Sequence, residues 1–180
     1  FEMALLGTGV MKGPFAVDKE YPNWGAEGEY DPLIKTVPEV NHVSLWDFYP
    51  DPEATSMEDA EYVVERHRMS RTQIRDLKTR PYFIESALQT AIDRGPDYEQ
   101  KYWERSMEDD DTQPTSERWQ VLEFWGYCDL KILEENGINV PSEYKDLDEA
   151  NCNIWVCNGE VIRFVMNPFK PAHIPYYAVP

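Results

Sequence analysis

Basic residues, cysteines and long apolar runs are all scarce in this sequence of 180 residues. Lysine and arginine number 17 against 34 aspartates and glutamates, which leaves a formal net charge of −17. A surface with this excess of negative charge repels phosphate backbones and anionic lipids, which argues against sequence-independent nucleic-acid binding and membrane adhesion. No apolar run approaches the ~20 residues that span a bilayer, so the sequence predicts no membrane helix.

The cysteines are Cys128, Cys152 and Cys157. An odd and sparse set does not form a disulfide framework, so we expect free thiols and a reducing compartment. The apolar start, residues 1–6, has no basic flank and is too short for a signal peptide. We interpret it as the end of a helix and, because an initiator methionine is missing, we expect the chain to be a fragment of a longer protein.

Apolar residues make up 42% and aromatic residues 13% of the chain, enough for one ordinary domain or two small ones with a packed core. Residues 10–17 are predicted to be extended, with a kink at Gly13 and Pro14. Residues 18–36 have the composition of a loop, and 37–48 have that of a strand.

Residues 60–68 are ambiguous, because Ser56 and Asp59 resemble a helix capping box. We nevertheless favour a strand, because β-branched residues cluster at the centre, and Tyr62, Val64, Arg66 and Arg68 alternate along the segment with Val63, Glu65 and His67. A clearer capping box, Ser70 with Gln73, predicts a helix over 71–79. A second helix is predicted to have Pro81 in its first turn and to end at Gly95, with one apolar face. That face comprises Phe83, Ala87, Leu88, Ala91 and Ile92.

The C-terminal half contains the strongest local signal, a β-hairpin of 152–157 and 160–166 joined by Asn158 and Gly159. This dipeptide tolerates the positive φ angles of a two-residue turn. The other segments are a strand at 119–127, a short helix at 129–136 and a proline-rich edge strand in the tail at 167–177. The sequence therefore predicts an α+β fold of mostly antiparallel strands with a few short helices packed on them.

Several patterns in the sequence resemble chemical sites. Gly7, Gly9 and Gly13 superficially resemble a phosphate loop, but a helix end precedes them and a strand follows, the reverse of the required order. We interpret them as a helix C-cap and a bend. Cys152 and Cys157 have opposite parity on one strand, which is unsuitable for one tetrahedral metal.

The histidines, His42, His67 and His173, are scattered, and none is expected beside a second metal ligand. The acidic run at 108–111 lacks the alternation of an EF-hand loop and is interpreted as solvated charge. With 34 acidic residues, abundance selects no catalytic carboxylate pair. The sequence therefore assigns no catalytic, cofactor-binding or metal-ligating residue.

Several stretches together resemble segments of the portal proteins of tailed bacteriophages, in particular the large portals of short-tailed phages. The resemblance spans most of the chain in the right order, although the acidic stretch has no counterpart. Each segment alone has low specificity, and the ordered series carries the resemblance. The segments are FEMALLGTGVMK (1–12), WDFYPDPEA (46–54), a Tyr-Val-Val run (62–64), MSRTQI (69–74), VLEFWGY (121–127), and EVIR (160–163) with the later Asn-Pro and Ile-Pro-Tyr.

The resemblance implies a non-enzymatic structural subunit of a ring, typically a dodecamer, at one vertex of a phage capsid. DNA passes through such a ring without specific binding, and the packaging terminase, tail adaptor and capsid proteins dock on it. It implies a location in the virion, and in the bacterial cytoplasm during assembly, with no cofactor and no membrane. The chain would comprise a wing-like α+β part (1–95), an exposed acidic loop (96–117) and a clip- or stem-like part (118–180) of a larger portal fold.

Other functions remain open at this stage. The chain could be an acidic protein-binding module of another virion or cellular protein, which predicts a self-contained domain. It could be a carboxylate-dependent hydrolase, which predicts two acidic residues with perturbed pKa values in a concave pocket. An acidic DNA mimic fits the charge and predicts carboxylates spaced like phosphates over one face.

Overall fold

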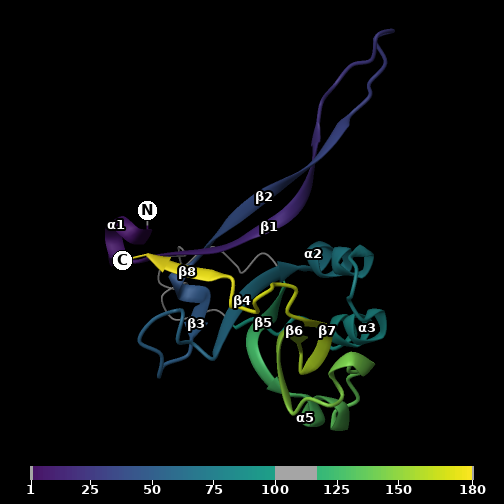
Figure 1. Cartoon of the computed structure of the whole chain (residues 1–180). Helices are drawn as coiled ribbons and strands as arrows, with labels where there is room; N and C mark the ends of the chain where they lie inside the picture. The colour runs from purple at the N-terminus through teal and green to yellow at the C-terminus, as the bar shows by residue number, and fades with distance from the viewer. Residues whose placement is uncertain (1, 100–116, 180) are drawn as a thin grey trace, which may run out of the picture. The chain divides into compact units, whose positions relative to one another are not determined.

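The computed structural model describes residues 2–99 and 117–179. The fold is α+β, as predicted, with two antiparallel sheets and a few short helices (Figure 1). The chain divides into two compact units: Phe1–Trp46 with Pro175–Pro180, and Asp47–Ile174. Among the described residues, none of the helices is long and apolar enough to cross a lipid bilayer.

The first unit contains a sheet with the strand order β2-β1-β8. Its elements are α1 (Glu2–Leu6), β1 (Gly9–Tyr21), β2 (Leu33–Val43) and β8 (Tyr176–Val179). β8 pairs only with Gly9–Lys12 of β1, so the rest of β1 and β2 forms a long two-stranded ribbon (Figure 1). β8 is an edge strand, but it covers only Tyr176–Val179, so of the edge strand predicted at 167–177 only the last two residues are confirmed.

The predicted loop at 18–36 is wrong at both ends, where residues 18–21 and 33–36 belong to strands, and is confirmed at 22–32, which connect them. β1 continues to Tyr21 and β2 begins at Leu33, with cross-strand pairs from Asp18↔Thr36 to Tyr21↔Leu33. The Thr36 hydroxyl donates to the Asp18 carboxylate across the ribbon. The prolines and glycines that suggested a loop are concentrated in the turn between the strands. The predicted strand at 37–48 ends early, at Val43, and is followed by η1 (Leu45–Asp47) and β3 (Phe48–Pro50).

The predicted kink at Gly13 is a β-bulge, because the β1–β2 register shifts between Lys12 and Phe15. Gly13 has a φ of +124°, and a Cβ there would lie 2.7 Å from the carbonyl oxygen of Glu39. The close approach of the neighbouring strand therefore requires glycine at this position.

The second unit contains a sheet with the strand order β3-β4-β5-β6-β7. Its longer strands are β4 (Tyr62–Ser70), β5 (Arg118–Asp129), β6 (Glu149–Cys157) and β7 (Glu160–Met166). The ambiguous segment at 60–68 is thus a strand, as we favoured. β6 and β7 form the predicted hairpin, with positive φ at Asn158 (51°) and Gly159 (76°). The predicted parts 1–95 and 118–180 both supply strands to this sheet.

Helices cover one face of the sheet. α2 (Arg71–Asp76) and η2 (Leu77–Thr79) form the helix predicted at 71–79, and the Ser70–Gln73 capping box is present. The second helix, α3 (Glu85–Asp93), begins later than predicted. Pro81 lies in a turn rather than in the helix, because Phe83 forms a β-bridge with Arg163 before the helix starts.

α2 and α3 enclose the main apolar core against the sheet. Its fully buried side chains include Ile74, Leu88 and Trp119. The Trp119 indole N–H donates to the carbonyl oxygen of Ala91 at 3.2 Å, so the ring is buried without an unsatisfied donor. A smaller cluster of Leu130, Val140 and Ala150 lies under α5 (Leu130–Glu135), the helix predicted at 129–136.

Candidate functional site

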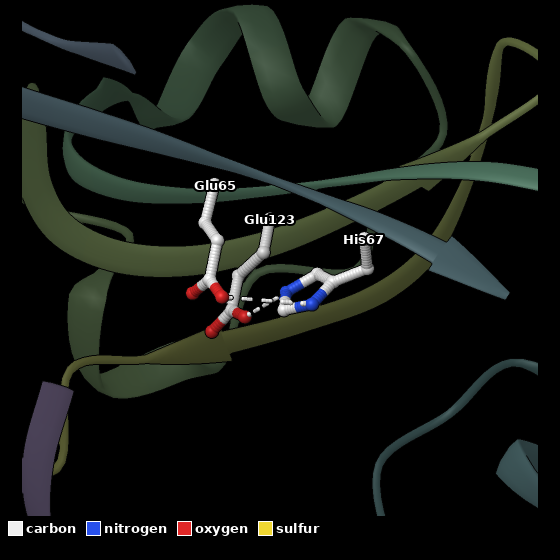
Figure 2. A group of neighbouring side chains, drawn as sticks. All are labelled: Glu65, His67 and Glu123. Carbon is white, nitrogen blue, oxygen red and sulfur yellow. Dashed lines mark hydrogen bonds and ion pairs between the residues drawn. The ribbon is translucent and has the colours of Figure 1, made fainter. Parts of the chain in front are cut away.

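A polar cluster of Glu65, His67 and Glu123, in which the two glutamates are buried and His67 is half-buried, lies on one face of the five-stranded sheet (Figure 2). Glu65 and His67 are two apart on β4 and therefore share a face. Glu123 lies on β5 directly opposite Glu65. His67 Nε2 is 2.7 Å from Glu123 Oε2, and His67 Nδ1 is 3.6 Å from Glu65 Oε1. The imidazole therefore presents one ring nitrogen to each carboxylate.

Glu123 is the centre of the hydrogen-bond network and is only 2% exposed. Its Oε1 accepts from the Trp125 indole N–H at 2.7 Å and from the Asn153 amide at 3.1 Å. The other oxygen, Oε2, accepts from His67 Nε2, so both oxygens of the buried Glu123 carboxylate have hydrogen-bond donors. Burying a carboxylate is tolerable only with such compensation.

The network continues across β6 to β7. Asn153 Oδ1 accepts from the Trp155 indole N–H at 3.1 Å and from Arg163 Nη1 at 2.7 Å. The Trp155 ring stacks on His67 with a centroid separation of 5.0 Å and an interplanar angle of 11°. These contacts fix the side chains of four neighbouring strands, β4 to β7, relative to one another.

Arg163 supplies positive charge at the end of the network. Burial lowers the pKa of its guanidinium, and the negative charge of Glu123 opposes that shift. Its Nε is buried without a hydrogen-bond partner among the described residues. The guanidinium also lies over the rings of Phe83 and Trp155, which provide further favourable contacts for a buried cation.

Two carboxylates and an imidazole are ligand types that hold divalent cations, and one ligand atom from each lies within 4.8 Å of the others. Glu123, however, already accepts hydrogen bonds on both oxygens, and Nε2 of His67 is already engaged with Glu123 at 2.7 Å. Glu123 is also too buried to reach a substrate. We therefore assign the cluster a structural role in holding the sheet together.

The prediction that no histidine has a second ligand beside it is wrong for His67. The i, i+2 spacing of Glu65 and His67 on a predicted strand was a usable signal. The contribution of Glu123 depends on the β4–β5 register, which the sequence does not specify. His42 Nε2 lies 3.5 Å from the Glu2 carboxylate, and His173 packs on Phe169.

The other candidates from the sequence are not brought together into a site. Gly7 follows α1 with its N–H bonded to the carbonyl oxygen of Met3, which confirms a helix C-cap. Cys157 lies in the main core, and the Sγ of the buried Cys152 lies 3.8 Å from the carbonyl oxygen of Gly126. All three cysteines are free. The acidic run at 108–111 lies outside the described residues.

A polar depression beside β4 is lined by several acidic residues, including Asp51, Asp59 and Glu61. The Asp51 carboxylate accepts from backbone N–H groups within the same loop. Asp59 accepts from the hydroxyls of Thr55 and Ser56 at 3.0 and 2.9 Å. These hydrogen bonds tie the carboxylates to the loop itself.

Several residues of the portal-like segments have specific structural roles. Asp47, in WDFYPDPEA, accepts from the buried Arg66 Nε at 2.8 Å. Burial lowers the pKa of Arg66, but the hydrogen bond and charge of Asp47 outweigh it, so the pKa is raised. Gly126, in VLEFWGY, has a φ of +158°, and a Cβ there would lie 2.6 Å from the carbonyl oxygen of Glu61. Glycine is therefore required where β5 approaches β4.

Comparison of the sequence with known protein families and with curated protein sequences gives no match.

Proposed function

We propose that the chain is part of a portal subunit of a tailed bacteriophage, a structural component of the ring through which DNA enters and leaves the capsid. The observation that carries the proposal is the ordered series of segments from 1–12 to 160–163 that resembles large portal proteins. In this function the chain is not an enzyme. Its partners are further copies of itself, the packaging terminase, and tail adaptor and capsid proteins.

The structural roles of these segments support the proposal. Ser70 and Gln73 of MSRTQI cap α2. Glu123 of VLEFWGY and Arg163 of EVIR belong to one buried network, which Asn153 connects. Residues with such roles are difficult to replace, so they are the positions at which a distant relative would keep a recognisable sequence.

The charge of the chain also fits a DNA conduit. A net charge of −17 disfavours attachment of a phosphate backbone. DNA can then slide past without being held, which a passage used for packaging and ejection needs.

Negative-stain electron microscopy of the purified protein, in the longest natural form that contains this chain, tests the proposal. We expect rings with a central channel and roughly twelve-fold symmetry, as the family resemblance implies. A particle that remains a monomer or dimer at concentrations of tens of micromolar would refute the portal function. The acidic protein-binding module would then become the better explanation.

A further inference from the structure

The outer part of the β1–β2 ribbon exposes large apolar side chains. We define the hairpin tip as residues 18–36. Both faces of its strands are exposed there. Trp24 is 66% and Ile34 is 67% exposed, and Tyr21, Tyr30 and Leu33 are also exposed. An isolated two-stranded hairpin is marginally stable in water, so this tip would gain stability from a surface that covers it.

The hairpin tip is also acidic. It contains five acidic residues and two lysines, a net charge of −3. The acidic residues are Asp18, Glu20, Glu27, Glu29 and Asp31. A partner for this tip therefore needs a surface that combines positive charge with apolar side chains.

The second unit has such a surface on α2 and η2. We define the basic surface as residues 71–80, with four basic residues and one aspartate, a net charge of +3 in a chain of net charge −17. Arg71, Arg75 and Arg80 are exposed. In the ranges 2–99 and 117–179, Arg75 and Arg80 form no ion pair. Next to them, the Tyr82 side chain is 72% exposed.

We propose that the hairpin tip of one copy docks on the basic surface of a second copy. Charge complementarity selects this occupant, since a tip-to-tip contact would set −3 against −3. A contact between two different surfaces of the same chain is heterologous, and heterologous contacts that close produce rings rather than twofold dimers. The proposal rests on the proposed ring and specifies which surfaces form its subunit contact.

Charge reversal tests the contact. The tip variant carries Glu27→Lys and Glu29→Lys, and the surface variant carries Arg75→Glu and Arg80→Glu. A control variant, Glu53→Lys with Glu58→Lys, makes the same charge change as the tip variant at exposed acidic residues outside both surfaces. Assembly of the purified protein is measured by sedimentation velocity and native mass spectrometry, and circular dichroism checks the fold of each variant.

We expect the tip and surface variants each to weaken assembly by about 10- to 100-fold, because close charge pairs across interfaces contribute this much. The control should assemble like the wild type. An equimolar mixture of the tip and surface variants should recover assembly, since each reversed tip then meets a reversed surface on the other copy.

The outcomes separate this proposal from the portal function. If the wild type forms rings and both variants assemble equally well, the docking contact is refuted and the portal function stands. If the four substitutions combined in one chain restore assembly but the mixture does not, the contact lies within a chain and the second copy is not the occupant. If the wild type forms no ring, both proposals fail.

Discussion

Replacing Glu123 with alanine tests the buried network directly. The substitution leaves the Trp125 indole N–H and the His67 ring N–H without their acceptor, and it removes one of the two acceptors of the Asn153 amide. Each buried donor that loses its partner costs about 1–3 kcal/mol. Relief of the repulsion with Glu65, which lies directly opposite, offsets part of this loss. We expect the free energy of unfolding to fall by about 3 kcal/mol.

The measurement is a urea titration followed by tryptophan fluorescence and far-ultraviolet circular dichroism. Glu123→Gln keeps one acceptor oxygen and the size of the side chain, so it should lose only about 1–2 kcal/mol. Glu149→Ala removes an exposed carboxylate from the neighbouring strand β6 and should change stability by less than about 0.5 kcal/mol. If Glu123→Ala unfolds at the same urea concentration and with the same slope as Glu149→Ala, the network does not stabilise the sheet and the reasoning is wrong.

Three further predictions concern other parts of the second unit. Gly126→Ala should destabilise the protein by about 1–3 kcal/mol in the same titration, because its Cβ would clash with β4; a change under 0.5 kcal/mol would contradict this. Asp47→Asn removes the negative charge that faces the buried Arg66. We expect the free energy of unfolding to fall by about 1–3 kcal/mol, and 1 M salt should reduce this loss only slightly. Unchanged stability would show that the pair of Asp47 and Arg66 does not stabilise the protein. At pH 8, a thiol reagent should modify Cys128 first, because a hydrogen bond from the neighbouring Cys152 thiol lowers its pKa, whereas burial raises the pKa of Cys157 to about 12. Mass spectrometry of partially labelled protein identifies the site, the urea-unfolded protein is the control, and earlier modification of Cys157 would contradict the assignment.

Much of the fold follows from local chemistry in the sequence. Ser70 and Gln73 determine where α2 begins, because side chains three residues apart satisfy each other's backbone N–H groups at a helix start. Asn158 and Gly159 determine the β6–β7 turn, since both tolerate the positive φ that a tight hairpin needs. These signals lie within a few residues and do not depend on distant partners.

The long ribbon and the buried network depend on tertiary pairing. Residues 18–21 and 33–36 have a loop-like composition, and they are strands because each pairs with the other across the turn. Pro81 has the right chemistry for a helix start, but the bridge between Phe83 and Arg163 delays α3.

Glu123 shows most clearly what the sequence left open. The sequence specifies by alternation which residues of β4 share a face, so Glu65 and His67 could be paired from it. It does not specify which residue of β5, more than 50 positions away, lies opposite them. A slip of one residue in that register would turn Glu123 to the other face of the sheet. The sequence alone therefore determined that β5 is a strand. Only the pairing of β5 with β4 in the folded sheet decided which residues form the hydrogen-bond network around Glu123.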